Sequence, residues 1–405
     1  MKIALLTPTF SHFSGIDRVV ELNAKELLRK GHRVSVFCFE GDINVPKLKV
    51  IKLGISKNQT IGRIYRLLFF LDRRKIRTYG SILRNYDVVI SHFYPMNLLA
   101  AYAKRKYGIR FVYHNHGVAP PWTFHSFPEK AYMWMFAKLS NWSIKDCDEA
   151  VSISKYLQGV LKRETCITSK VVYDPIDTTR FHPGIDGQHI RKKYHIPKDA
   201  LLLFYNGRVS PHKGVHLLLD AFAMVRKKQP NAWLIISGRH TFPAYSKKLK
   251  EQAAQFGKHA SFTGFTPDEE LPHYYAACDV FVTCSLWEGF NMNIAEAQAC
   301  GKPVVAFDVG PHREIVKRGK LVAKGGLTDF AEAVLAAGRN PGLVRNSITS
   351  PPSRSPPPPF RERWTITRSH RQGGSPIGEC RSSVSTDVSR ARRGGERASR
   401  RRQDK

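Results

Sequence analysis

Short apolar runs alternate with amphipathic helical patterns along most of this 405-residue chain. Residues 88–91 have the length and β-branched content of a buried strand, whereas residues 16–30 repeat apolar side chains at helical spacing. Regular alternation of this kind predicts parallel sheets that are covered by helices on both faces. It restricts the fold strongly, because all-helical and all-antiparallel architectures do not produce this pattern.

The alternation forms two series, each long enough for a domain. The first predicts strands at residues 3–6, 34–37, 49–53, 88–91, 111–113, 150–153 and 171–173, with helices between them such as 16–30 and 95–106. The second starts at residues 201–206 and continues through 217–225, 233–237, 261–263, 271–278, 280–283, 294–299 and 304–307. Asp174-Pro175-Ile176-Asp177 breaks the pattern between them. We therefore expect two doubly wound domains, residues 1–175 and 176–340.

The composition changes from about residue 341 onward. Residues 341–405 contain 14 arginines and one lysine, and only 8 of these 65 residues are Leu, Ile, Val or Phe. Such a segment cannot bury enough apolar surface to fold, so we expect a disordered basic tail. The tail either contacts nucleic acid or lipid, or is out of frame with the ancestral gene and encodes nothing selected. We favour the second interpretation.

The formal net charge of +32 indicates an anionic partner. Residues 341–405 hold 15 basic and 5 acidic side chains, which leaves +22 for the first 340 residues. Membrane surfaces and nucleic acid are the general partners of such chains, and of the two we expect an anionic membrane surface. Residues 63–71, followed by the basic stretch 72–77, have a basic amphipathic character. This character is typical of a helix in a membrane interface, and equally of a helix packed on a sheet.

Neither a transmembrane helix nor a signal peptide is expected. The chain has no run of 18 or more apolar residues, and its N-terminus enters a strand at once. Its seven cysteines lack metal-ligand spacing, which predicts buried free thiols in a reducing compartment. We therefore expect a cytoplasmic protein with peripheral contact at the inner face of the membrane.

Glu288 and Glu296 stand eight residues apart in the segment 285–310. Residues 280–283 predict a buried strand, and residues 294–299 predict a helix that opens just after the intervening loop. We expect the carboxylates at the carboxyl end of a parallel strand and in the first turn of the helix, where open α/β sheets bind ligands. Unpaired N–H groups at a helix opening favour an anion, and carboxylates accept hydrogen bonds from sugar hydroxyls. The combination suits a sugar nucleotide.

The same segment resembles the glutamate–seven–glutamate motif of the retaining glycosyltransferases with the GT-B fold, family 4 in particular. The flanking sequence also matches, in Gly289-Phe290, in the strand entry at residues 299–305 and in the turn at Gly310. For the two glutamates alone, a plain βαβ unit with surface carboxylates is the alternative, which the flanking matches disfavour. The resemblance covers roughly residues 1–335 and implies two Rossmann-like domains that face a cleft.

The resemblance implies a donor site for a nucleoside-diphosphate sugar in the second domain. Arg208 and Lys213 would bind the diphosphate, whose charge grows as the glycosidic bond breaks. Glu296 would accept hydrogen bonds from the ribose, and Glu288 would contact the transferred sugar. The other implied donor-binding positions are Gly207 and Gly238, which keep the backbone open, and Phe290, Asn291 and Met292, which supply backbone N–H groups.

Two segments of the first domain also resemble the family. Gly15 ends a loop that matches the family's glycine-rich turn toward the diphosphate, although Ser14-Gly15 stands where the family usually has two glycines. His116 matches a family histidine near the reacting sugar better than His114 does. It could bind a sugar hydroxyl or orient the acceptor, and a structural role is the alternative.

The implied reaction is transfer of a sugar to a glycan or lipid-linked acceptor with retention of configuration. In front-face attack the departing phosphate accepts the acceptor's proton, so no enzymic nucleophile is required. We expect no Asp-x-Asp metal site, no metal and no cofactor beyond the sugar nucleotide. Signatures of an epimerase or a phosphorylase are not visible.

The alternative from another class is a catalytically inactive, basic binding protein on a GT-B scaffold. The family normally ends with a helix that crosses back onto the first domain, and residues 341–405 cannot supply one. This departure and the high charge favour the alternative.

Overall fold

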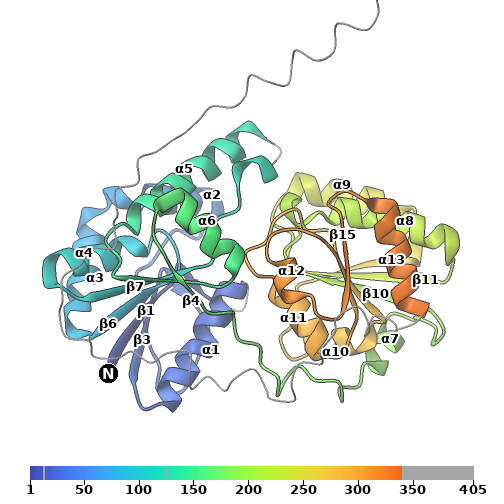
Figure 1. Ribbon diagram of the computed structural model, residues 1–405, viewed down its shortest axis with the longest axis horizontal. Coiled ribbons are helices and arrows are strands. Elements are labelled where there is room, and N and C mark those ends of the chain that lie inside the picture. The colour runs from blue at the N-terminus through green and yellow to red at the C-terminus, as the bar shows by residue number, and fades with distance from the viewer. Residues whose placement is uncertain (12–13, 125, 340–405) are drawn as a thin grey trace, which may run out of the picture.

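The computed structural model describes residues 1–11, 14–124 and 126–339. Within these residues the chain forms two α/β units side by side, each a sheet with helices on both faces (Figure 1). The expected doubly wound architecture is confirmed. The predicted tail lies outside the described residues, and the predicted boundary near residue 175 stays a prediction.

The first unit is built on a parallel sheet with the order β5-β3-β1-β6-β7-β8-β9. Its strands are β1 (Lys2–Leu6), β3 (Arg33–Cys38), β5 (Lys49–Lys52), β6 (Val88–Ser91), β7 (Arg110–Asn115), β8 (Glu149–Ser152) and β9 (Lys170–Val171). A short parallel pair, β2 (Thr9–Phe10) and β4 (Glu40–Gly41), lies apart from it. The helices are α1 (Gly15–Arg29), α2 (Gln59–Leu68), α3 (Arg73–Ile82), α4 (Asn97–Tyr107), α5 (Phe127–Ser143) and α6 (Lys155–Thr165), with 3₁₀ turns η1 (Phe69–Leu71), η2 (Leu83–Asn85) and η3 (Pro121–Thr123).

The second unit has a parallel sheet with the order β12-β11-β10-β13-β14-β15. Its strands are β10 (Leu201–Asn206), β11 (Ala232–Ser237), β12 (Ala260–Gly264), β13 (Val280–Thr283), β14 (Val304–Phe307) and β15 (Gly319–Val322). The helices are α7 (Gln188–Lys193), α8 (Val215–Lys228), α9 (Pro243–Ala254), α10 (Leu271–Ala277), α11 (Met292–Ala299), α12 (His312–Ile315) and α13 (Leu327–Arg339), with 3₁₀ turns η4 (Pro211–Lys213) and η5 (Gly257–His259).

Each sheet is buried on both faces, which explains the continuous apolar runs in the sequence. In β10, Leu203 and Tyr205 belong to the core under α8 and α13, whereas Leu202 and Phe204 belong to the core on the opposite face. Successive strand residues point to opposite faces, so a strand between two helical layers needs apolar side chains at every position. In both sheets the order reverses beside the first strand, β1 or β10, and this switch point is where ligands bind.

Some predicted elements need correction. The helix predicted at residues 95–106 begins two residues later, at Asn97. The basic segment 63–77 is not one helix but α2, η1 and α3, because Asp72 caps a new helix by accepting a hydrogen bond from the Lys75 N–H. Helices α5 and α6 lie where the alternation predicted helices without stating their bounds, whereas α9, α13 and β15 of the second unit were not predicted.

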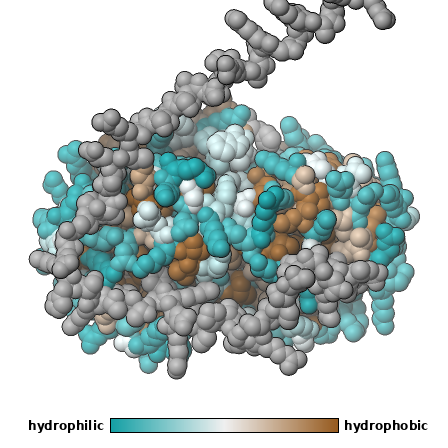
Figure 2. Space-filling model, in the orientation of Figure 1, coloured by the Kyte–Doolittle hydropathy of each residue, from teal (hydrophilic) through white to brown (hydrophobic). Residues whose placement is uncertain are grey.

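The face seen in Figure 2 is largely hydrophilic, and most of the cysteines in the described ranges are buried. Hydrophilic residues cover much of the face in Figure 2, with apolar residues gathered between them. No helix in the described ranges is long and apolar enough to span a membrane. The six cysteines in those ranges are free, and all except Cys166 are buried, as expected.

Candidate active site

A cavity of about 890 Å³ lies between the two units, at the carboxyl ends of their strands. Loops that follow β1 and β7 line it from the first unit, and loops that follow β10, β11 and β13 line it from the second. Every site residue predicted from the sequence lines this cavity, namely Gly15, His116, Gly207, Arg208, Lys213, Gly238, Glu288, Phe290, Asn291, Met292 and Glu296. The two units thus bring together segments that are far apart in the sequence.

Helix α11 begins earlier than predicted. Asn291 has a left-handed backbone (φ 85°), a conformation that asparagine tolerates better than most residues, and the helix starts directly after it at Met292. Glu296 therefore lies in the second turn of α11, not in the first as predicted. The side chains of Phe290 and Met292 are buried in the core beside the cavity, so packing is their main role.

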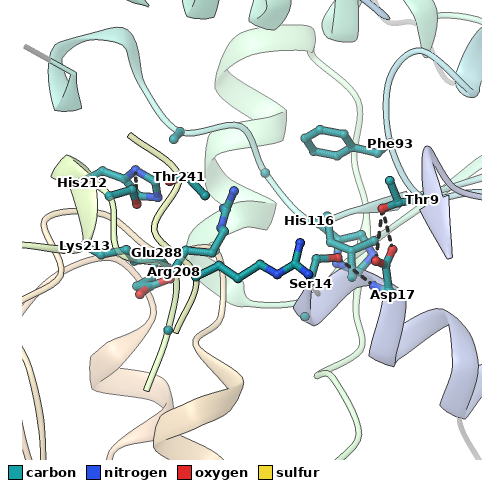
Figure 3. A pocket seen from close by; sticks show the side chains of 18 of the residues that line it. Thr9, Ser14, Asp17, Phe93, His116, Arg208, His212, Lys213, Thr241 and Glu288 are labelled. Carbon is teal, nitrogen blue, oxygen red and sulfur yellow. Dashed lines mark hydrogen bonds and ion pairs between the residues drawn. The ribbon is translucent and has the colours of Figure 1, made fainter. Parts of the chain in front are cut away.

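Lys213 and Glu288 form an ion pair inside the cavity (Figure 3). The Lys213 Nζ lies 2.7 Å from Glu288 Oε2, and the Ser285 hydroxyl donates a hydrogen bond of 2.8 Å to Oε1. Burial opposes ionisation of Glu288, but Lys213, His312 and the hydrogen bond from Ser285 together outweigh it and keep the pKa of this carboxyl below its ordinary value. Glu288 is therefore a carboxylate at neutral pH, held in one orientation.

Glu296 is almost fully buried on α11, yet it borders the cavity. The Tyr275 hydroxyl donates a hydrogen bond of 2.8 Å to its Oε2 atom. Burial raises the pKa of Glu296, although Arg18 and Tyr275 oppose the shift. A carboxylate in this position gains from further donors, and ligand hydroxyl groups would supply them.

The loops after β10 and β11 approach each other closely. Gly238 has a φ of 138°, and a Cβ at this position would lie 1.8 Å from the carbonyl oxygen of Gly207. Only glycine fits there, because a side chain would collide with the neighbouring backbone. From these loops, Arg208 extends across the cavity toward Ser14 and His116 of the first unit (Figure 3).

His116 borders the cavity from the first unit, whereas His114 does not. Its Nε2 atom lies 3.0 Å from Nδ1 of His92, a residue that the sequence did not single out. Burial, together with the neighbouring His114 and His92, holds the pKa of His116 well below 6.5, so its imidazole is neutral. A neutral ring donates a hydrogen bond from one nitrogen and accepts one at the other.

Asp17 is a cavity residue that the sequence analysis missed. It is 1% exposed on α1, and the Thr9 hydroxyl lies 2.9 Å and 3.1 Å from its two carboxyl oxygens (Figure 3). Burial raises its pKa to about 6, against lowering by hydrogen bonds from Thr9 and the backbone of Ser11. The sequence signal that could have identified Asp17 was an acidic residue two positions after Gly15.

Direct contacts join the two units beside the cavity. Arg18 on α1 forms an ion pair with Asp268 of the second unit. The Ser154 hydroxyl donates a hydrogen bond of 2.9 Å to the carbonyl oxygen of Gly289. These contacts fix the two sets of site residues relative to each other.

Two facing Rossmann-like units with a cavity between their switch points define the GT-B class of glycosyltransferase. A family model described as Glycosyltransferase Family 4 matches residues 13–180, and one described as Glycosyl transferases group 1 matches residues 186–349. The chain therefore belongs to glycosyltransferase family 4 and is a hexosyltransferase-type enzyme. The inactive binding protein is not favoured.

Relatives and solved structures agree with this assignment. The putative glycosyltransferase EpsD of Bacillus subtilis is 28% identical over 70% of this chain and 73% of its own length. The lipopolysaccharide core biosynthesis mannosyltransferase LpsB of Rhizobium meliloti is 32% identical over 45% of this chain and 56% of its own length.

Two solved structures show the same fold. Sucrose-phosphate synthase from Thermosynechococcus elongatus gives a TM-score of 0.71 at 19% identity, over 85% of this chain and 91% of its own. Anabaena HepE in complex with UDP and glucose gives a TM-score of 0.69 at 23% identity, over 83% of this chain and 89% of its own.

Proposed function

We propose that the chain is a retaining glycosyltransferase that moves a hexose from a nucleoside-diphosphate sugar to a glycan or lipid-linked acceptor. The observation that carries the proposal is the convergence of Arg208, Lys213, Glu288 and Glu296 on one cavity between two switch points. The names of the relatives support it, since they include a mannosyltransferase.

The donor would lie along the second unit. Glu296 would bind the ribose hydroxyls, and the diphosphate would lie between Arg208, Lys213 and the N-terminus of α11. Two cations and helix-terminal amides stabilise the charge that builds up on the diphosphate as the glycosidic bond breaks. These groups do so without a metal ion, and we propose that the reaction is metal-independent.

The ion pair with Glu288 holds the Lys213 ammonium in position to bind the diphosphate. A donor diphosphate would share the Lys213 ammonium with Glu288, which then turns its other oxygen toward the transferred sugar. The acceptor would attack from the same face, and the departing phosphate oxygen would take its proton. His116, neutral and at the edge of the first unit, would hold a hydroxyl of the sugar or of the acceptor.

The test is turnover of UDP-, GDP- and ADP-hexoses by the full chain, followed by nucleoside diphosphate release and by the anomeric signals of the first product in ¹H NMR. An α-linked donor is expected to give an α product, and chelation of divalent metals is expected to leave the rate unchanged. A β product would contradict retention. Absence of turnover with every donor, from a folded sample, would contradict the proposed reaction.

A membrane-borne acceptor is supported by an apolar surface on α2, η1, η3 and α5, here called the α2–α5 surface. Its exposed side chains are Ile61, Ile64, Leu68, Leu71, Trp122, Phe127, Trp134, Met135 and Trp142. Trp122 and Phe127 are 74% and 81% exposed, and aromatic side chains of this kind favour membrane interfaces. Arg63 and Arg66 of α2 line the nearby cavity, where they would attract an anionic acceptor.

Vesicle flotation tests the membrane proposal. The native chain is expected to float with anionic phosphatidylglycerol vesicles and to lose most binding in the double variant Trp122→Ser and Phe127→Ser. Lys227→Ser with Lys228→Ser, on α8 of the second unit, is the control and should bind as the native chain does. Equal flotation of both double variants would contradict a role for the α2–α5 surface.

A further inference from the structure

Three histidines gather beneath the cavity floor, at the carboxyl edge of the first sheet. His92 follows β6 directly, and His114 belongs to β7. Because Ser91 pairs with Tyr113 in parallel register, His92 and His114 lie at the same level of the sheet. His116 lies two residues beyond His114, and positions two apart in an extended chain share a face.

The three rings are close and buried. Their centroids lie 4.8 Å apart for His92 and His114, 5.3 Å for His92 and His116, and 4.5 Å for His114 and His116. Nitrogen atoms that can ligate, one from each ring, all lie within 4.8 Å of one another. The exposed fractions of the three side chains are 0%, 2% and 6%.

The chemistry of the rings favours a cation that is bound through lone pairs. All three rings are buried, and a neutral imidazole offers one nitrogen lone pair to a cation. The Nε2 atom of His92 has no hydrogen-bond partner among the described residues. A buried polar atom in this state destabilises the fold, and a metal–nitrogen bond or a new hydrogen bond would remove that penalty.

We propose that His92, His114 and His116 form a binding site for a borderline divalent transition-metal ion of the Zn²⁺ type. Three imidazoles are the ligand set of open tetrahedral zinc sites, with Zn–N bonds of about 2.0–2.1 Å and ligand nitrogens about 3.3 Å apart. The three nitrogens, now within 4.8 Å of one another, would reach that spacing by rotation of the side chains. The fourth position would face the cavity, since His116 is the member that lines it.

The site is inhibitory, a consequence that rests on the proposed function. With its nitrogen lone pair on the metal ion, His116 could no longer accept a hydrogen bond from a sugar or acceptor hydroxyl and would offer only its remaining N–H as a donor. The transferase would then work without metal and lose activity when this class of cation binds. Mg²⁺ and Ca²⁺ prefer oxygen ligands and should have no such effect.

The test is Co²⁺ titration of the tag-free full chain, followed by the visible absorption of low-coordinate cobalt, with Zn²⁺ as competitor. A single ion is expected to bind per chain and to be displaced by Zn²⁺. His92→Ala and His114→Ala should each weaken binding by more than about 10-fold, the size reported for loss of even an outer-sphere partner. His189→Ala is the control, because His189 and His273 form another histidine pair in the second unit, with centroids 4.7 Å apart.

Two results would overturn the proposal. One is loss of the cobalt signal in His189→Ala but not in His92→Ala, and the other is a loaded native chain whose X-ray absorption shows fewer than three imidazole ligands. The second measurement needs no variant, so it holds even if a substitution prevents folding. Neither depends on turnover, so failure of the metal site and failure of the proposed transferase reaction are distinguishable. With turnover established, Zn²⁺ should inhibit the native chain, and full activity of the Zn²⁺-loaded enzyme would refute the inhibitory role.

Discussion

At the scale of single residues, Lys213 has two tasks. It balances the carboxylate of Glu288 in a setting where both side chains are largely buried, with exposed fractions of 16% and 7%. It also lies where the donor diphosphate is proposed to bind. Removing one partner of such a pair leaves an uncompensated charge, which is costly in a protein interior.

Lys213→Ala is therefore expected to lower kcat by about 10²–10³-fold, the usual effect of losing one group that stabilises a developing anion. Steady-state kinetics with the best donor measures the change, with Lys317→Ala on the exposed surface as control. The double variant Lys213→Met with Glu288→Gln should recover stability without recovering activity. Normal turnover in Lys213→Ala would remove Lys213 from the mechanism.

The raised pKa of Asp17 predicts that the free energy of unfolding falls as the pH rises. Its pKa is raised from 3.8 to about 6 in the folded chain, so the folded state keeps the proton longer than the unfolded state does. The contribution of Asp17 to the free energy of unfolding is fully present below pH 3.8 and is lost as the pH rises through 6. The total is about 3 kcal/mol, of which about 1 kcal/mol is lost between pH 5 and pH 7.

Urea unfolding of the native chain and of Asp17→Asn at pH 5 and pH 7 checks this sign. Between pH 5 and pH 7, the free energy of unfolding of the native chain should fall by about 1 kcal/mol relative to that of Asp17→Asn. The buried histidines act in the opposite direction, because their lowered pKa values favour the unfolded state at low pH, but both proteins contain them. An unchanged difference between the two proteins would refute a raised pKa for Asp17.

At the scale of elements, helix α6 of the first unit is capped by the second. Glu314 on α12 accepts hydrogen bonds of 2.8 Å from the backbone N–H groups of Lys155 and Tyr156, at the start of α6. The N-cap Ser154 satisfies a third N–H group, that of Leu157. A carboxylate at this helix end also interacts favourably with the helix dipole.

Glu314→Ala should destabilise the chain by about 1 kcal/mol or more through loss of this cap. Thermal unfolding measures the effect, and hydrogen exchange at the Lys155 and Tyr156 amides should accelerate. Glu332→Ala, which removes an exposed ion pair with Lys228, is the control. Equal Tm values for the two variants would show that the contact between α6 and α12 is unimportant.

The elements also show how far the sequence predicts the fold and the site. Most strands were predictable because a strand buried on both faces is largely apolar, as in β13, whereas the partly exposed β15 was not predicted. The bounds of helix α5 were not predictable, because exposed aromatic residues such as Trp134 and Trp142 blur its helical periodicity. Donor-site residues were predictable because they lie in short local motifs. The contact between His92 and His116 was not, because it depends on the pairing of β6 with β7.

At the scale of the whole molecule, the proposed function depends on a cavity that is lined by both units. Gly15 of the first unit and Met292 of the second show this closeness, since a Cβ on Gly15 would lie 3.6 Å from the Met292 sulfur. A ligand that fills the cavity would contact both units at once. Binding only to the folded chain stabilises it by about 2.7 kcal/mol when the free ligand is at 100 times its Kd.

Thermal unfolding of the full chain with UDP, GDP or ADP, beside Glu296→Gln, tests the central claim most directly. One nucleoside diphosphate is expected to raise Tm by several degrees, and the shift should be greatly reduced in the variant, whose amide accepts ribose hydrogen bonds less strongly. That result would support the donor site and identify the nucleotide. A folded native chain whose Tm responds to none of the three would contradict the proposed donor site.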